Sequence, residues 1–141
     1  MDWDKLLADA GGQAVWRLSG PAGDALGAEA AARELGFFTA RIDGAAAQDK
    51  RALLGQLAER LRFPDYFGGN WDALADCLRD LDEWTGALAF LIVFEDAGKI
   101  CRSDPEDAGA LLDVLESAAR FWRGRARPFK AVFSADRLSP S

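Results

Sequence analysis

The sequence predicts an α/β fold, with a small parallel sheet of three or four strands flanked by helices. Two observations support this prediction. Strand-like apolar segments alternate with segments of helical periodicity, an order typical of parallel strands joined by right-handed helical crossovers. The run GALAFLIVFED (86–96) is also continuously apolar at its centre, as expected for a strand that is buried on both faces.

The first four elements carry clear local signals. AVWRLSG (14–20) is a short apolar segment that ends in a Gly-Pro turn, which predicts a strand. The alanine-rich segment 22–36 predicts a helix that Gly36 closes. FFTARIDG (37–44) predicts a second strand, and leucines at helical spacing predict a second helix over residues 48–62.

Pro64 ends this second helix, because a proline disfavours helical geometry in the residue before it. After the loop DYFGG we expect a helix from about residue 71 to 83, and then the buried strand 86–96. A polar loop leads to a helix over 106–122, and FKAVFS (129–134) predicts the last strand.

The chain of 141 residues, half of them apolar, is long enough to form a core without disulfides or metals. We expect residues 1–36 to be a strand–helix extension packed on the same domain as residues 37–141, because 14–18 carries a strand signal. A loosely attached arm is the alternative. The start MDWDKLLADAGG lacks the basic-then-apolar order of a signal peptide, and no apolar run suits a membrane span, so we expect a cytoplasmic location.

The chain contains no histidine. This excludes histidine general bases, Ser-His-Asp and Cys-His nucleophile systems, and most zinc sites. An enzyme remains possible, but it would have to use carboxylates, lysine or a bound divalent ion. Cys77 and Cys101 form no Cys-x-x-Cys pair, and we expect one buried and one incidental cysteine rather than a disulfide.

The net charge of −6 is concentrated in one stretch. Residues 63–84 hold six acids and one base, a sum of −5, while the rest of the chain sums to −1. Phosphate binding needs clustered Lys and Arg, so we expect no direct binding of nucleic acid. A local negative field suits a cationic partner and speeds association. The basic tail, which could otherwise touch RNA, is interpreted as a solvated surface: Arg120, Arg123, Arg125, Arg127 and Lys130.

The acidic helix has two distinct faces at about 100° per residue. Asn70 suits the N-cap and Asp72 the first turn, where the helix dipole favours negative charge. One face is apolar and should pack inward: Leu74, Cys77, Leu78 and Leu81. The opposite face is acidic: Asp72, Asp76, Asp80 and Glu83. Like charges four residues apart repel, and only Arg79 is near enough to compensate, so we interpret this face as functional.

Three uses of such a face remain open from the residues alone. Carboxylates four residues apart could bind Mg²⁺, or could form an acid/base pair, although glycosidases usually take that pair from separate elements. A basic pocket on a protein partner is the third use. The preceding loop fits it, because Tyr66 is expected to be exposed and Gly68 and Gly69 let a partner approach the backbone. Phe67 is expected to anchor the loop in the core.

The run FPDYFGGNWDALADCL (63–78) closely resembles the signature of the barstar family of ribonuclease inhibitors. The resemblance covers about residues 37–134 and says nothing of the first 35. It implies an α/β fold and inhibition of a secreted or toxin ribonuclease, whose cationic active site the acidic helix and loop would block in a 1:1 complex. With this resemblance, we expect a protein that is not an enzyme and has no cofactor. Asp76 would take the place of a substrate phosphate, Asp72 would pair with another cationic group, and Tyr66 and Asn70 would contact the enzyme.

The sequence departs from the family pattern at three places. Ala75 stands where the family has a tryptophan, Phe67 replaces a tyrosine, and a glutamate of the family's last helix aligns near Ser117, with Glu116 adjacent. We therefore expect the cognate enzyme to be a different ribonuclease, such as a toxin domain that this protein neutralises in the producing cell. The alternative function is a non-inhibitory module for another cationic partner. The predicted partner-binding residues are Tyr66, Phe67, Gly69, Asn70, Asp72, Ala75, Asp76 and Asp80.

Overall fold

The computed structural model describes residues 1–138 and contains one parallel sheet in the order β1-β4-β3-β2. Its strands are β1 (Val15–Leu18), β2 (Phe38–Asp43), β3 (Phe90–Glu95) and β4 (Phe129–Ser134). Each neighbouring pair is parallel. The predicted α/β fold with a small parallel sheet is confirmed.

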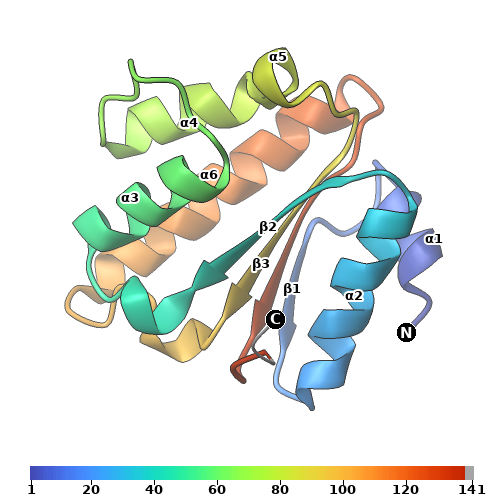
Figure 1. Cartoon of the computed structure of the whole chain (residues 1–141), viewed down its shortest axis with the longest axis horizontal. Coiled ribbons are helices and arrows are strands. Elements are labelled where there is room, and N and C mark those ends of the chain that lie inside the picture. The colour runs from blue at the N-terminus through green and yellow to red at the C-terminus, as the bar shows by residue number, and fades with distance from the viewer. Residues whose placement is uncertain (139–141) are drawn as a thin grey trace.

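Helices cover both faces of this sheet (Figure 1). One face carries α1 (Trp3–Ala8) and α2 (Ala22–Glu34). The other face carries α3 (Lys50–Arg60), α4 (Trp71–Arg79), α5 (Leu81–Thr85) and α6 (Pro105–Arg123). Two short 3₁₀ turns, η1 (Gly44–Ala46) and η2 (Ala97–Lys99), follow β2 and β3.

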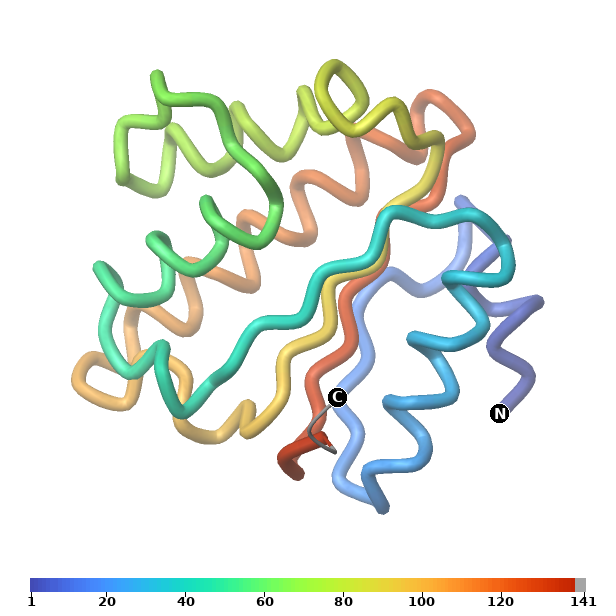
Figure 2. Tube along the Cα trace, viewed as in Figure 1, coloured from blue at the N-terminus to red at the C-terminus, as the bar shows by residue number. Residues whose placement is uncertain are grey.

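The path of the chain explains why the helices divide in this way (Figure 2). From the edge strand β1 the chain crosses by α2 to the opposite edge strand, β2. It then returns stepwise, by α3 to α5 into β3 and by α6 into β4. Parallel crossovers are right-handed, so a reversal of direction across the sheet places the returning helices on the other face.

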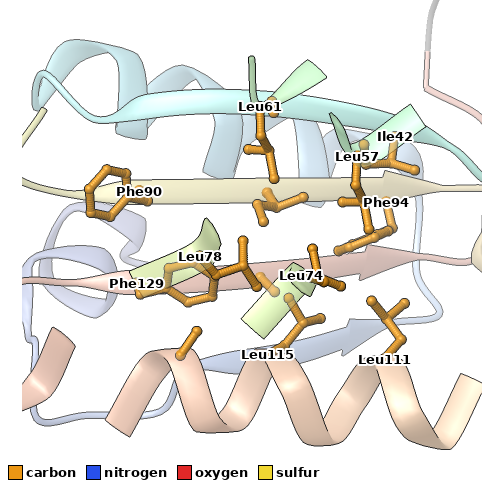
Figure 3. Packing of buried hydrophobic residues seen from close by; sticks show 14 of the residues in the cluster. Ile42, Leu57, Leu61, Leu74, Leu78, Phe90, Phe94, Leu111, Leu115 and Phe129 are labelled. Carbon is orange, nitrogen blue, oxygen red and sulfur yellow. The ribbon is translucent and has the colours of Figure 1, made fainter. Parts of the chain in front are cut away.

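The central strand β3 is buried along its whole length. It spans Phe90–Glu95, which is shorter at its start than the predicted 86–96. Two apolar clusters, one on each face of the sheet, form the core. Figure 3 shows the larger one, in which Leu74 and Leu78 of α4 meet Phe129 of β4 and Leu115 of α6. The acidic helix is therefore fixed directly on the main core.

The N-terminal residues form a helix that the sequence analysis did not predict. Asp2 caps α1 by accepting from the Lys5 amide at 3.3 Å. Trp3 and Leu7, four residues apart, are buried, and Trp3 packs edge-on against Trp16 at 5.4 Å. The helix has only six residues, too few for its periodicity to stand out beside the acidic residues around it.

Strand β1 joins the sheet by pairing with β4. Lys130 of β4 is 1% exposed, and its Nζ donates to the carbonyl oxygens of Asp9 and Gln13, at 2.7 Å each. Burial lowers the pKa of Lys130. The interpretation of the basic tail as wholly solvated is thus wrong for Lys130. Its buried ammonium needs hydrogen-bond acceptors, and the N-terminal segment supplies them.

Glutamine side chains bond to the backbone of both edge strands. Gln56 of α3 accepts from the amide of Asp43, the last residue of β2, and donates to its carbonyl at 3.0 Å. On the other edge, the Gln13 amide donates to the carbonyl of Val15, the first residue of β1, at 2.8 Å. These side chains take positions at which another strand could otherwise pair.

Both cysteines are free and buried, so the expectation of one incidental cysteine is wrong. Cys77 lies on the inner face of α4, as predicted. Cys101 lies in the turn after η2, where its amide donates to the carbonyl of Ala47 at 2.9 Å. That long-range contact folds the turn into the core, which no local sequence pattern reveals.

Candidate functional site

The loop and the start of α4 are shaped by a cap at Asn70. Its backbone is extended, with φ −133° and ψ 174°, and its side-chain oxygen accepts from the amide of Ala73 at 2.7 Å. Asp72 lies in the first turn, where the helix dipole stabilises its charge. The predicted cap is confirmed. Just before it, Gly69 has φ +69°, a conformation that glycine adopts without steric cost.

Buried leucines and two tryptophans hold this segment in place. Leu74 and Leu78 face the core, as the helical spacing predicted. The indole N–H of Trp122 in α6 donates to the Leu78 carbonyl at 2.9 Å. The indole N–H of Trp84 donates to the Leu61 carbonyl, also at 2.9 Å. The backbone is thus tied down at both ends of the segment, so its outer face is presented rigidly.

The aromatic loop residues divide as expected. Phe67 packs on the core and meets Phe63 edge-on at 5.0 Å, and Phe63 in turn meets Trp84 at 6.1 Å. Tyr66 is 69% exposed. Desolvation, and at high pH the charge of the Cys77 thiolate together with the charges of Asp80 and Glu83, raise the pKa of the Tyr66 phenol, so it stays neutral near pH 7. The loop thus displays one uncharged aromatic side chain.

The acidic face is exposed over α4. Asp72 and Asp76 are exposed, while Ala75 and Asp80 are half-buried. Arg79 forms an ion pair with Asp76, three residues earlier in the helix. Burial raises the pKa of the Cys77 thiol, and the charges of Asp80 and Asp76 add to this shift. The face therefore carries its negative charge on carboxylates, with a neutral thiol beneath them.

The predicted continuous helix over 71–83 is wrong beyond Arg79. The chain turns at Asp80, with φ −111° and ψ 9°, and α5 then runs to Gly86, whose φ is +67°. The break keeps Leu81 buried and lets Trp84 reach its carbonyl partner. The angular placement of Glu83 beside Asp76, which assumed one regular helix, no longer holds.

Sequence reasoning missed the pair formed by Trp71 and Lys50. Trp71 is the first residue of α4 and is half-buried against the main core. The ammonium of Lys50, at the start of α3, lies 5.8 Å from its ring centre. A tryptophan directly after an N-cap could have been noted from the sequence. Its cation, about twenty residues earlier on another helix, could not.

Glu116 and Ser117, near which a glutamate of the family's last helix aligns, lie on α6. Glu116 is exposed and Ser117 is half-buried.

Within residues 1–138, no group of three or more Cys, Asp or Glu side chains is placed to hold a metal ion. The search for helices long and apolar enough to cross a membrane found none in the same residues.

A family model described as Barstar (barnase inhibitor) matches residues 37–134, which is more than half of the chain. The chain belongs to the barstar family. Its barstar-family region runs from β2 to β4 and includes the loop and α4, whereas α1, β1 and α2 precede it. A search of curated proteins found no match. Members of this family are inhibitors rather than enzymes, and membership implies binding to a barnase-like ribonuclease protein.

Proposed function

We propose that this barstar-family chain inhibits a bacterial ribonuclease by covering its cationic active site with α4 and the preceding loop. The observation that carries the proposal is the pair of exposed carboxylates on Asp72 and Asp76, held on a rigidly packed helix beside the exposed ring of Tyr66. A ribonuclease binds phosphates through Lys and Arg, so two fixed carboxylates are suited to the same groups.

Asp76 is the central residue of the proposed contact. Its side chain is 70% exposed and pairs only with Arg79 among the described residues, so its carboxylate can exchange that partner for a cationic group of the enzyme. Surface ion pairs of this kind contribute at most about 1 kcal/mol, so the exchange costs little. Buried in the complex, the carboxylate would occupy the place of a substrate phosphate.

The neighbouring residues have supporting parts in this proposal. Asp72 pairs with a second cationic group, and Asp80 adds to the negative field from its half-buried position. Tyr66 packs on the enzyme surface, while Phe67 holds the loop from beneath. Asn70 and Gly69 contribute by shaping the loop that meets the rim of the active site.

Ala75 lies on the same face and carries no ring. A tryptophan there would add apolar contact area, so we propose that the cognate enzyme is not barnase itself but a related secreted or toxin ribonuclease. The complex is proposed to be 1:1 and to form in the cytoplasm of the producing cell. Failure to inhibit any such enzyme, together with capture of another basic protein, would favour the alternative of a non-inhibitory binding module.

The decisive experiment measures RNA cleavage by barnase, and by ribonucleases secreted by the source cell, with increasing amounts of the chain. We expect one of these enzymes to be fully inhibited at equimolar ratio. The Asp76→Ala variant should bind it more weakly by about 2–5 kcal/mol, mainly through faster dissociation, which is the general range for truncating one partner of a buried charge pair in an interface.

The matched control is Asp113→Ala, which removes the same charge from an exposed position of α6. This control should inhibit as the unchanged chain does. If Asp76→Ala and Asp113→Ala inhibit equally well, the site is not on α4. If no ribonuclease is inhibited even by a large excess of the chain, the proposed function is wrong.

A further inference from the structure

The structure contains a pocket of about 520 Å³ that shares no residue with the acidic helix. It lies where β1 and β4 end, and two neighbouring elements complete it. The turn around η2 contributes Gly98 and Ile100, and the first half of α6 contributes Leu111 and Leu112. The volume is in the range of pockets that hold small molecules.

The pocket exists because the sheet extends beyond its helix layer. Side chains alternate along β1, so Trp16 enters the core under α1 and α2, while Arg17 faces the other side. On that side α6 packs on β4 and α4. Beyond β4, the end of β1 therefore forms one wall of an open pocket, with Phe133 of β4 between it and α6.

The position of the pocket matches the general location of ligand sites in open parallel sheets. The chain leaves β1 towards α2 on one face, and it leaves β3 towards α6 on the opposite face. Ligands bind at the carboxyl ends of strands where the connections diverge in this way. At the ends of the neighbouring strands β2 and β3, Arg137 forms ion pairs with Asp43, Glu95 and Asp96. These side chains occupy the space at those strand ends.

The lining has a simple chemistry. Its walls are mostly aliphatic and aromatic, and among the described residues that line it only Arg17 has a charged side chain. Arg17 is exposed and forms no ion pair with any residue in the part of the chain that the structure describes. Asp107 and Asp136 adjoin lining residues in sequence without lining the pocket. An unpaired guanidinium beside an apolar hollow is complementary to an anion with an apolar body.

We propose that this pocket binds a small monocarboxylic acid with an apolar body. The carboxylate pairs with the Arg17 guanidinium, and the apolar body lies against Leu111, Leu112 and Phe133. The site depends on β1, which precedes the family-matched region, so it is a property of this chain's N-terminal extension. It provides a ligand site separate from the surface proposed to bind a ribonuclease.

The test uses three probes: octanoate, octanol and acetate. Titration of the full chain, followed by amide chemical shifts, should show saturable changes at Ser19 and Gly98 with octanoate. Octanol, which has the apolar body without the charge, should bind more weakly. Acetate, which has the charge without the apolar body, should not saturate. Absence of saturable octanoate binding, or changes confined to other parts of the chain, would overturn the proposal.

Two variants test separately the charge of Arg17 and the volume of the pocket. Arg17→Gln should weaken octanoate binding about tenfold and leave octanol binding unchanged, because only the carboxylate uses the guanidinium. Ala135→Trp places bulk in the pocket from an exposed position and should abolish binding of both probes. The control Arg120→Gln removes the same charge from the other half of α6 and should bind octanoate as the unchanged chain does.

Equal octanoate affinity in Arg17→Gln and Arg120→Gln would contradict the role of Arg17. Retained binding in Ala135→Trp would place the site elsewhere. The urea midpoint of each variant checks that it is folded. Asp76→Ala should bind octanoate normally and Arg17→Gln should inhibit the ribonuclease normally, so the two proposals can fail independently.

Discussion

Asn70 illustrates how one side chain can serve both the fold and the surface. Its oxygen caps α4 through the Ala73 amide, and its own backbone is the last part of the loop that precedes the acidic face. The free energy of the cap and the position of the loop are therefore coupled. A partner that meets this loop meets a backbone already ordered by the helix it precedes.

The first prediction concerns this cap. Asn70→Ala should lower the free energy of unfolding by about 1 kcal/mol, because an amide of the first turn loses its acceptor. Asn70→Ser, which keeps an oxygen at the same position, should lose much less. Urea denaturation measures both variants. An unchanged midpoint in Asn70→Ala would show that solvent satisfies the amide equally well.

A second prediction concerns Cys101. Burial raises the pKa of its thiol to about 11, above the value of 9.0 for a free cysteine. Between these two pH values the unfolded chain loses the proton first, so the thiol's contribution to stability is complete below about pH 9 and is lost as the pH rises towards 11. The decline in unfolding free energy over this window should be smaller in Cys101→Ala.

The measurement for Cys101 is chemical denaturation across that pH range, with Cys77→Ala as a comparison. Native protein near pH 8 should also react slowly with a thiol reagent, because both cysteines are buried and protonated. Rapid modification of either thiol in the folded chain would contradict this assignment.

At the scale of elements, α4 and its loop behave as one rigid unit. The helix has only nine residues, yet it is held by the core on its inner face and by the Trp122 indole at its end. Its exposed side is acidic, and within residues 1–138 only Arg79 forms an ion pair with it. The negative field of these fixed carboxylates extends into solvent, so it can attract a cationic partner before the two proteins touch.

A third prediction follows for association with the cognate ribonuclease. The association rate should fall by about tenfold or more between ~10 mM and ~500 mM salt, because exposed charges are screened at high ionic strength. Asp72→Ala should reduce both the rate at low salt and its dependence on salt. Stopped-flow mixing gives these rates, and a rate that does not change with salt would remove the steering role of α4.

Much of the arrangement of helices and strands could be predicted from the sequence. The inner face of α4 was correctly predicted because its apolar residues recur at helical spacing, and β3 because its apolar run has no polar interruption. The break at Asp80 was not, because it depends on where Leu81 and Trp84 must pack. The contact of Lys50 with Trp71 was also missed, since it joins two helices whose packing no local pattern encodes.

At the scale of the whole molecule, residues 1–36 add one strand to the sheet and a helix layer to its second face. The apolar residues Leu91, Val93 and Val132 of the central strands lie under that layer. Charged contacts join it to the rest of the chain: Lys130 bonds with two N-terminal carbonyls, and Glu29 of α2 pairs with Arg41 of β2. We propose that residues 1–36 and 37–141 form one folding unit.

The last prediction tests this unit directly. A chain shortened to residues 37–141 should lose cooperative unfolding and bind a hydrophobic dye, because three central apolar side chains and the Lys130 ammonium lose their cover. Thermal denaturation and dye fluorescence provide the measurement. If the shortened chain unfolds cooperatively at the same temperature, the first 36 residues are an accessory rather than a part of the fold.

The glutamines on the two edge strands have a consequence for the molecule in a crowded cell. An open sheet offers its outermost strands to any other extended chain, and such pairing is a common first step towards aggregates. Here Gln13 and Gln56 already bond to backbone groups at the start of β1 and the end of β2. We expect that replacing either glutamine by a residue without a side-chain amide would free these backbone groups and increase the tendency of the protein to polymerise.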